Sequence, residues 1–368
     1  MPKSKVYFTD MRCPMGTSLL DKLDKLICAA GIQTIDFKNR YTAIKLHFGE
    51  PGNLSFLRSN FAKTVADRVK TLGGKPFLTD CGTLYVGRRN NALVHLDAAM
   101  ENGFSPLSTG CQNIIADGLK GTDDIEVPIN GGEYLKTAMI GRAVMDADIF
   151  ISLSHFKGHE CTGFGGALKN IGMGCGSRAG KMIMHNDAKP KVSQRACVGC
   201  QTCAKSCAQN AITFTDGKAQ IDLNKCVGCG RCIGSCLFDA IYNRSSSSND
   251  MLNYKIAEYA KAVVDGRPHF HICIANQISP YCDCHSENDA AIVPDVGMFA
   301  SFDPVAIDRA CIDAVNAAPV LKGTVLDEAP RGKDHFTSIH PSTDWRSQID
   351  HAEKIGLGSG EYELITIK

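Results

Sequence analysis

The feature that most constrains this chain is a repeated cysteine pattern between residues 197 and 236. The first copy reads CVGCQTCAKSC and the second reads CVGCGRCIGSC, so both have the spacing C-x2-C-x2-C-x3-C. This spacing is typical of 4Fe–4S binding, because two-residue gaps let one tight loop direct three thiolates at three irons. The cysteines are Cys197, Cys200, Cys203 and Cys207 in the first copy and Cys226, Cys229, Cys232 and Cys236 in the second.

The fourth cysteine of each copy begins a helix that points away from its own loop, towards the other cluster. We therefore expect the two copies to exchange ligands. The predicted ligands are Cys197, Cys200, Cys203 and Cys236 for cluster one, and Cys226, Cys229, Cys232 and Cys207 for cluster two. Proline usually follows the fourth cysteine, but Ala208 and Leu237 stand there. We expect this difference to shift cluster potentials without preventing ligation.

Zinc is the main alternative, because it also uses paired C-x2-C ligands. However, zinc needs four ligands per ion and has no use for a third cysteine at the same interval in both copies. Disulfides are a weaker alternative, because the N-terminal sequence MPKSKVY lacks the apolar core of a secretory signal.

The spacer between the copies predicts a β-hairpin. Asp216-Gly217 is a strong two-residue turn signal between the apolar positions of residues 211–214 and 219–222. Ala240-Ile241 repeats Ala211-Ile212 after the second copy. The segment is therefore predicted to be an α+β, bacterial-type ferredoxin unit with two clusters.

The remainder of the chain favours an α/β class with a layered, largely parallel sheet, because strands alternate with helices. Residues 191–244 would be the ferredoxin-like insertion in a discontinuous domain of residues 1–190 and 245–368, with a polar linker at 245–250. The predicted strands are residues 5–9, 42–48, 75–79, 113–116, 145–147, 149–153 and 269–275, and the predicted helices are 18–30, 61–72, 252–264 and 306–315.

Composition argues against several classes of function. The net charge is +1 without a basic run, which gives no reason to expect nucleic acid or a membrane surface as a partner. No apolar stretch approaches the length of a membrane span. The chain has 18 cysteines, and without a signal peptide we expect them as reduced thiols and metal ligands in the cytoplasm.

Ligands of parallel sheets bind at the carboxyl ends of the strands. Lys45 and His47, Asp80, and Ser154-His155 are predicted to lie at such ends. The alternative for each is ordinary loop polarity.

A glycine-rich segment, SHFKGHECTGFGGALKN at residues 154–170, holds Lys157 and Lys169, which could bind an anion. Its glycines would let backbone N–H groups approach a ligand closely. It does not lead into a phosphate-binding loop, because Cys175 occupies the position of the first glycine. The alternative is that the segment only packs against the insertion. Its metal-capable residues, with those that follow, are His155, His159, Glu160, Cys161, Cys175 and His185.

A second segment, ISPYCDCH at residues 278–285, follows a predicted buried strand. A C-x-C pair in an extended segment places both side chains on one face. Cys282, Cys284 and His285 could thus form a third metal site with Cys161, or with His155 or His159. The alternatives are a redox-active dithiol or two unrelated thiols.

Together these motifs resemble the domain-of-unknown-function family numbered 362, and specifically its members with an inserted two-cluster ferredoxin segment. The resemblance extends to about residue 315 and implies an iron–sulfur protein of anaerobes with an α/β body whose motif loops converge on one site. The motifs are KLHFGE at 45–50, FLTDCGTLY at 77–85, ADGLKG at 116–121, SHFKGH at 154–159, GFGGALKN at 163–170, ISPYCDC at 278–284 and DPVAID at 303–308.

The sequence thus predicts an oxidoreductase in which two 4Fe–4S clusters, reduced by a partner protein, pass low-potential electrons to a site in the α/β domain. Lys45, Lys157 and Lys169 would hold a small anionic substrate, and His155 or His159 would transfer protons, with His47 beside them. A non-enzymatic electron carrier and a metal-handling protein are the alternatives. No nicotinamide or flavin fingerprint is present, and the sequence does not determine the substrate or the oligomeric state.

Overall fold

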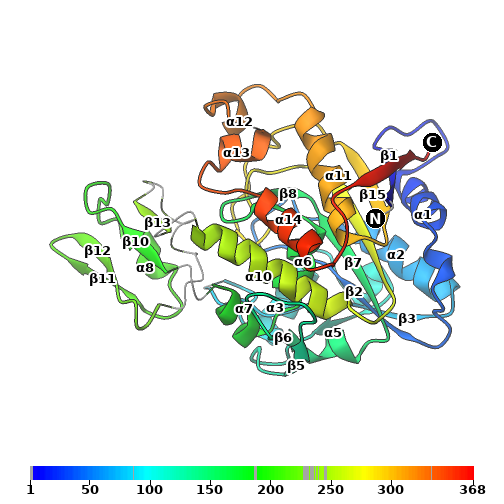
Figure 1. Ribbon diagram of the computed structural model, residues 1–368, viewed down its shortest axis with the longest axis horizontal. Coiled ribbons are helices and arrows are strands. Elements are labelled where there is room, and N and C mark those ends of the chain that lie inside the picture. The colour runs from blue at the N-terminus through cyan, green and yellow to red at the C-terminus, as the bar shows by residue number, and fades with distance from the viewer. Residues whose placement is uncertain are drawn as a thin grey trace.

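The chain is built around one eight-stranded sheet (Figure 1), in a computed structural model that describes residues 3–85, 87–185, 189–226, 232, 236, 238, 240–243, 247–332 and 334–368. The strand order is β16-β1-β15-β14-β7-β2-β3-β4. In this sheet β15 runs antiparallel to both of its neighbours, and all the other neighbouring strands pair in parallel. The predicted α/β class with a largely parallel sheet is therefore confirmed.

The strands of this sheet are β1 (Ser4–Asp10), β2 (Tyr41–Lys45), β3 (Lys75–Asp80), β4 (Gln112–Ile115), β7 (Ile149–His155), β14 (His269–Ala275), β15 (Gly297–Ser301) and β16 (Tyr362–Thr366). Two-stranded sheets pair β5 (Asp124–Pro128) with β6 (Thr137–Gly141), β8 (Lys157–His159) with β9 (Gly163–Gly165), β10 (Pro190–Val192) with β13 (Ile241–Asn243), and β11 (Ile212–Thr215) with β12 (Lys218–Ile221).

Helices cover both faces of the large sheet, so its central strands are buried on both sides and read as apolar runs. One face packs Ile44, Ile151 and Ile272 against α1 (Leu19–Ala29) and α2 (Ser59–Thr71). The other packs Ala43 and Phe150 against α6 (Ala167–Cys175), α10 (Ser247–Val264) and α11 (Pro304–Ala317). The remaining described helices are η1 (Ile32–Thr34), α3 (Ala92–Glu101), α4 (Pro106–Thr109), α5 (Arg142–Asp146), α7 (Arg178–His185), α8 (Thr202–Lys205), α12 (Val325–Glu328), α13 (His335–Ile339) and α14 (Arg346–Lys354).

Three local predictions were wrong. Residues 145–147, predicted as a strand, lie at the end of α5, because alternation over three residues does not separate strand from helix. Strand β2 ends at Lys45 rather than residue 48. The serine-rich stretch predicted as a linker already belongs to α10 from Ser247 onward, because this helix is held by its packing against α6.

The segment with the cysteine repeat forms a lobe apart from the large sheet (Figure 1). Its ends meet where β10 pairs with β13. The predicted hairpin is confirmed by the pairing of β11 with β12, and Asp216 and Gly217 have the positive φ angles, 51° and 72°, that a two-residue turn requires. Strands β14 and β15, which follow the lobe in sequence, lie in the same sheet as β2 and β3. The domain boundaries themselves stay a prediction.

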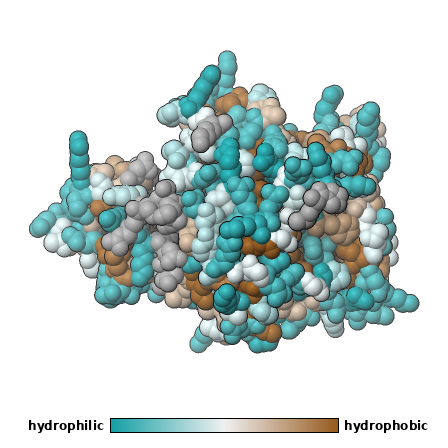
Figure 2. Space-filling model, in the orientation of Figure 1, coloured by the Kyte–Doolittle hydropathy of each residue, from teal (hydrophilic) through white to brown (hydrophobic). Residues whose placement is uncertain are grey.

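The surface of the molecule is mostly polar on the face drawn in Figure 2, where hydrophilic residues predominate and hydrophobic ones are scattered between them. None of the helices in the described part of the chain combines the length and apolarity needed to cross a membrane.

A buried carboxylate joins α11 to α6. Asp308 accepts hydrogen bonds from the backbone N–H groups of Ala167, at 2.6 Å, and Leu168, at 2.8 Å. Gly166 makes this approach possible, because a Cβ there would lie 2.2 Å from a carboxylate oxygen. Burial raises the pKa of Asp308 to about 7, although the two N–H donors oppose the shift.

This shift predicts a pH dependence of stability. Because the folded-state pKa of Asp308 lies above its unfolded value, the folded state binds more protons between the two values, and Asp308 should lower stability as pH rises from about 4 to about 7. We expect Asp308→Asn to remove this contribution. Urea unfolding of both proteins at about pH 5 and about pH 8 measures it. An equal pH dependence in the variant would contradict the prediction.

Candidate functional site

A cavity opens at the carboxyl ends of the central strands. Lys45 and His47 border it after β2, and Asp80 at the end of β3. Helix α6 forms one wall, and Leu252 and Ile256 of α10 form another. The cavity encloses about 990 Å³ of free space, part of it open to solvent. The glycine-rich segment and the C-x-C loop both reach it, so loops far apart in the sequence converge here.

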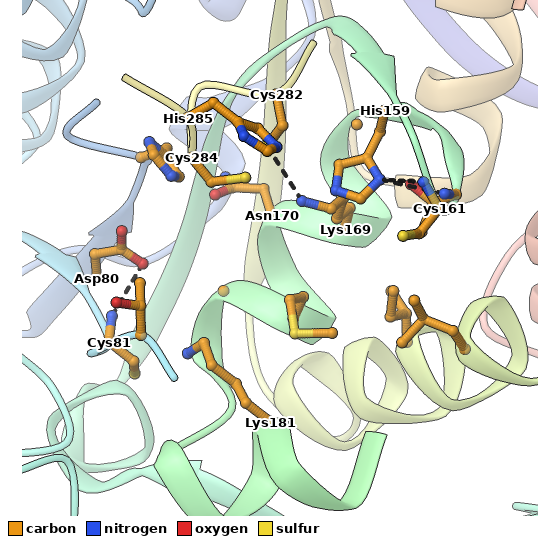
Figure 3. A pocket seen from close by; sticks show the side chains of 18 of the residues that line it. Asp80, Cys81, His159, Cys161, Lys169, Asn170, Lys181, Cys282, Cys284 and His285 are labelled. Atoms are coloured by element: carbon orange, nitrogen blue, oxygen red, sulfur yellow. Dashed lines mark hydrogen bonds between the residues drawn. The ribbon is translucent and has the colours of Figure 1, made fainter. Parts of the chain in front are cut away.

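Two thiols occupy one corner of the cavity, together with His159 and Lys169 (Figure 3). The Lys169 ammonium donates to Cys282 Sγ at 3.4 Å. One ring nitrogen of His159 and the Sγ atoms of Cys282 and Cys284 all lie within 4.8 Å of one another. Cys282 is buried at 1 % exposure, so its interactions with these neighbours are little screened by water.

The protonated nitrogen of His159 follows from its hydrogen bonds. Its Nδ1 accepts from the backbone N–H groups of Cys161, at 3.1 Å, and Thr162, at 3.2 Å. A nitrogen that accepts carries no proton, so the proton of the ring is on Nε2. His159 also hydrogen-bonds the Cys282 side chain. Because Nδ1 is committed to the backbone, this bond comes from Nε2–H.

The two thiols have opposite acidities. The hydrogen bond from Cys284 lowers the pKa of Cys282 well below its ordinary value, with help from Lys169 and His159 and against the effect of burial. The same hydrogen bond and burial raise the pKa of Cys284. Burial alone would lower the pKa of Lys169, but Cys282, Cys284 and Glu160 raise it. The corner therefore places two neighbouring sulfur atoms against one ammonium group.

Asp283, between the two cysteines, turns away from the cavity and anchors the loop. It lies 2.9 Å from His155 Nδ1 and 2.9 Å from Lys157 Nζ. His155 Nε2 is 2.7 Å from the carbonyl oxygen of Asn276. Both ring nitrogens of His155 thus face acceptors, and His155 is not among the cavity-lining residues. Of the two histidines expected to transfer protons, only His159 borders the cavity.

The opposite wall is held by internal ion pairs. Lys45 Nζ lies 2.9 Å from Asp80 and donates to Asn170 Oδ1 at 2.8 Å. Burial would raise the pKa of Asp80, but Lys45 and the other nearby cations hold it below its usual range. Arg89 pairs with Glu50 at 2.8 Å. Lys45, predicted to bind substrate, therefore already has a buried carboxylate partner.

His47 borders the cavity as a neutral donor. Its Nδ1 accepts from the N–H of Gly49 at 3.0 Å, which places the proton on Nε2. Burial and then the charge of Arg89 hold its pKa well below the ordinary value. Nε2 has no hydrogen-bond partner in the described part of the protein. A ligand in the cavity could accept this hydrogen bond.

Two cavity cations differ from the rest. Within the described residues, neither Lys169 nor Lys181 of α7 has a carboxylate within ion-pair distance, in contrast to Lys45 and Lys157. Lys181 Nζ donates to the carbonyl oxygen of Gly176 at 2.5 Å. Among the described lysines of the cavity, these two ammonium groups are therefore the candidates for holding an anionic ligand.

Of the partners predicted for the C-x-C pair at a third metal site, His159 lies beside both cysteines, and Cys161 falls in another group. Cys282 and Cys284 group with His159, Cys284 and His285 group with Glu160, and Cys161 groups with His159 and Glu160. His285 Nε2 lies 2.8 Å from Glu160. Sequence reasoning missed Arg89 and the anchoring role of Asp283, because no spacing rule links a charged side chain to a partner so far away in the sequence.

A second hollow, of about 320 Å³, lies in the lobe of the cysteine repeat. It is lined by Cys197, Cys200 and Cys203 of the first copy and Cys236 of the second, with Phe214 and Ile241 beside them. Cys207, Cys226 and Cys232 are described but do not line it, and Cys229 lies outside the described residues.

Backbone N–H groups point at the sulfur atoms of this lobe. Ala219 donates to Cys197 Sγ at 3.4 Å and Ala240 to Cys236 Sγ at 3.3 Å. Such bonds favour thiolates and are one way in which a protein tunes an iron–sulfur centre.

Residues 42–313 match the family described as Domain of unknown function (DUF362). The protein belongs to this family. The match spans the strand ends, the glycine-rich segment and the C-x-C loop, so the cavity lies within the DUF362 region. No curated protein matches the chain.

Two solved structures resemble this DUF362 protein distantly. The lactate racemase apoprotein from Thermoanaerobacterium thermosaccharolyticum has a TM-score of 0.35 at 11 % identity, over 74 % of this chain and 50 % of that one. A protein from Thermotoga maritima has a TM-score of 0.38 at 9 % identity, over 91 % of this chain and 58 % of that one. The chain thus spans about half of the length of these two structures.

Proposed function

We propose that this DUF362 protein is an iron–sulfur oxidoreductase. In this proposal residues 191–244 form a two-cluster ferredoxin module that serves the cavity in the α/β body. One observation carries the proposal: Cys236, from the second copy of the repeat, lines the same hollow as Cys197, Cys200 and Cys203 of the first. Exchange of the fourth ligand between copies is the arrangement of two-cluster ferredoxins.

The donor set suits a 4Fe–4S cube better than zinc. In a tetrahedral zinc site all sulfur ligands lie about 2.3 Å from the ion, so they crowd closely together. Among the described residues, the groups of three metal-capable atoms within 4.8 Å of one another all fall in the α/β cavity and not among these four cysteines. The four sulfur atoms surround a hollow, and two of them accept hydrogen bonds from backbone N–H groups. This arrangement fits a 4Fe–4S cube better than a single zinc ion.

The chain connects the module to the cavity on both sides. Helix α7 precedes the module and ends at His185, and α10 follows it with Leu252 and Ile256, and all three residues line the cavity. When bound, the two clusters would supply single electrons at low potential. Lys169 and Lys181 hold an anionic substrate, and His159 borders the same cavity beside Cys282.

A redox partner protein would reduce the module, and a reducing compartment such as the cytoplasm suits the many thiols. A simple electron carrier has no need of the cavity, with its buried thiols and cations. For that reason we favour an enzyme over a carrier.

Purification without oxygen tests the proposal. We expect about eight irons and about eight sulfides per chain, as two 4Fe–4S cubes require. Chemical reduction should produce the electron paramagnetic resonance signal of reduced 4Fe–4S clusters. A colourless preparation that contains zinc and no sulfide would overturn the proposal.

A further inference from the structure

We infer that Cys282 and Cys284 form a dithiol–disulfide pair that reduces a small disulfide bearing carboxylate groups. The inference deepens the proposed function, on which it rests for its supply of electrons. It is carried by the convergence of three donors on one buried sulfur atom at the wall of the cavity.

The first step of the argument is the surroundings of Cys282. Its sulfur accepts from the ammonium of Lys169 at 3.4 Å, from His159 and from the thiol of Cys284. A sulfur that accepts from three donors is stabilised as a thiolate, which is the nucleophilic form of cysteine. The Sγ atom of Cys284 lies within 4.8 Å of that of Cys282. This is the pairing of an attacking and a resolving cysteine.

The second step of the argument is that the surroundings of Cys282 and Cys284 favour a redox pair over a metal-binding site. A histidine that ligates a metal usually donates its other ring N–H to a carbonyl or carboxylate. In His159 the other nitrogen accepts from two backbone N–H groups, so Nε2 bears the proton and donates. The Lys169 ammonium also lies 3.4 Å from Cys282 Sγ, and its positive charge would repel a metal ion bound to that sulfur. Both observations favour a hydrogen-bonded thiolate.

The third step concerns the substrate. Lys169 lies beside Cys282, and Lys181 lies on another wall of the cavity (Figure 3). As neither has a carboxylate partner among the described residues, both can pair with acidic groups of a ligand. A compact disulfide with a carboxylate on each half has acidic groups for both ammonium groups, and Lys169 would hold its own half close to Cys282.

The chemistry balances with the electrons of the proposed function. The Cys282 thiolate attacks the substrate disulfide, forms a mixed disulfide and expels one half as a thiolate, which takes the proton of Cys284. The Cys284 thiolate then attacks Cys282, and the second half leaves as a thiolate that takes a proton from solvent. Two electrons and one proton return the resulting disulfide to the Cys282 thiolate and the Cys284 thiol. In sum, one disulfide, two electrons and two protons give two thiols.

The experiment uses the full chain, purified without oxygen, primed with dithiothreitol and then freed of it. Cystine is the probe, and cystamine, which has the same S–S bond and no carboxylates, is its matched control. We expect wild-type protein to convert cystine to cysteine and to acquire a Cys282–Cys284 disulfide, identified by mass spectrometry. Cystamine should react about tenfold more slowly, as expected when a charge-assisted contact is lost.

Three variants sharpen the result. Cys284→Ser should stop at a cysteine residue attached to Cys282, whereas Cys282→Ser should abolish the reaction. Cys28→Ser, on α1 and outside the cavity, should react like wild type. Modification that maps to other cysteines, or an equimolar metal ion that Cys282→Ser no longer binds, would overturn the inference.

Priming by dithiothreitol does not require the clusters, so the two proposals fail separately. Intact clusters without thiol exchange would refute the dithiol pair and leave the iron–sulfur proposal standing. Exchange at Cys282 in a protein without iron would do the reverse.

Discussion

Replacing Cys207 together with Cys226, Cys229 and Cys232 by serine should leave about four irons per chain, whereas replacing Cys236 with the same three should leave almost none. The two variants share three substitutions and differ only in whether Cys207 or Cys236 is the fourth cysteine replaced. The expectation follows from the hollow lined by Cys197, Cys200, Cys203 and Cys236, which the first variant keeps complete. The second variant removes one of its four sulfur atoms.

Iron and sulfide analysis after purification without oxygen measures the difference, and electron paramagnetic resonance identifies the remaining cluster. Circular dichroism of both variants controls for loss of the α/β body. If each copy of the repeat bound its own cluster, Cys207 would be the fourth ligand of the first copy, and the outcome of the two variants would be reversed. That reversal would refute ligand exchange between the copies.

Asp283→Ala should lower the free energy of unfolding by about 3–5 kcal/mol, the usual cost of removing one partner from a buried ion pair. Asp283 is the carboxylate partner of both Lys157 and His155, each 2.9 Å away. All three side chains are almost fully buried, so water cannot replace the lost charge. The nearby cations hold the pKa of Asp283 below its usual range against the effect of burial.

Urea unfolding without oxygen measures this loss. Asp283→Asn keeps the shape and removes the charge, and it should be nearly as damaging. The control is Asp67→Ala, which breaks an exposed pair with Lys63 and should cost less than about 1 kcal/mol. A small effect of Asp283→Ala would show that the C-x-C loop is anchored by other contacts.

Local features were predictable because short-range geometry determines them. Ser18 caps α1 through a reciprocal bond with Asp21, as helix-start rules lead one to expect. Strand β14 has the predicted bounds, His269–Ala275, because most of its residues are apolar and all but the first are buried. The turn at Asp216-Gly217 follows from residues that tolerate positive φ. In contrast, Met145 and Asp146 end helix α5 instead of forming a strand, because a pattern that short is decided by the surrounding packing.

The candidate site was predictable only in part. The strand-end rule brought Lys45, His47 and Asp80 to the cavity. The rule did not reveal that Lys45 is held by Asp80 or that His155 is held by Asp283. Such pairings depend on which distant segments come into contact in the folded protein, and local patterns in a single sequence do not determine those contacts. Lys169 and Lys181 are distinguished from the other lysines of the cavity only by the absence of a carboxylate partner among the described residues, which the sequence does not reveal.

The sequence by itself determined the cysteine spacing, the alternation of strands and helices and the set of chemically capable residues, because each depends on the backbone of a few neighbouring positions. The tertiary structure decided which side chains pair with one another and which face the cavity. Because a buried charge without a partner is costly, most of the buried charged side chains described above have a partner of opposite charge. What remains, the sulfur of Cys282 beside Lys169, His159 and a second cysteine, is defined by packing across the carboxyl edge of the sheet.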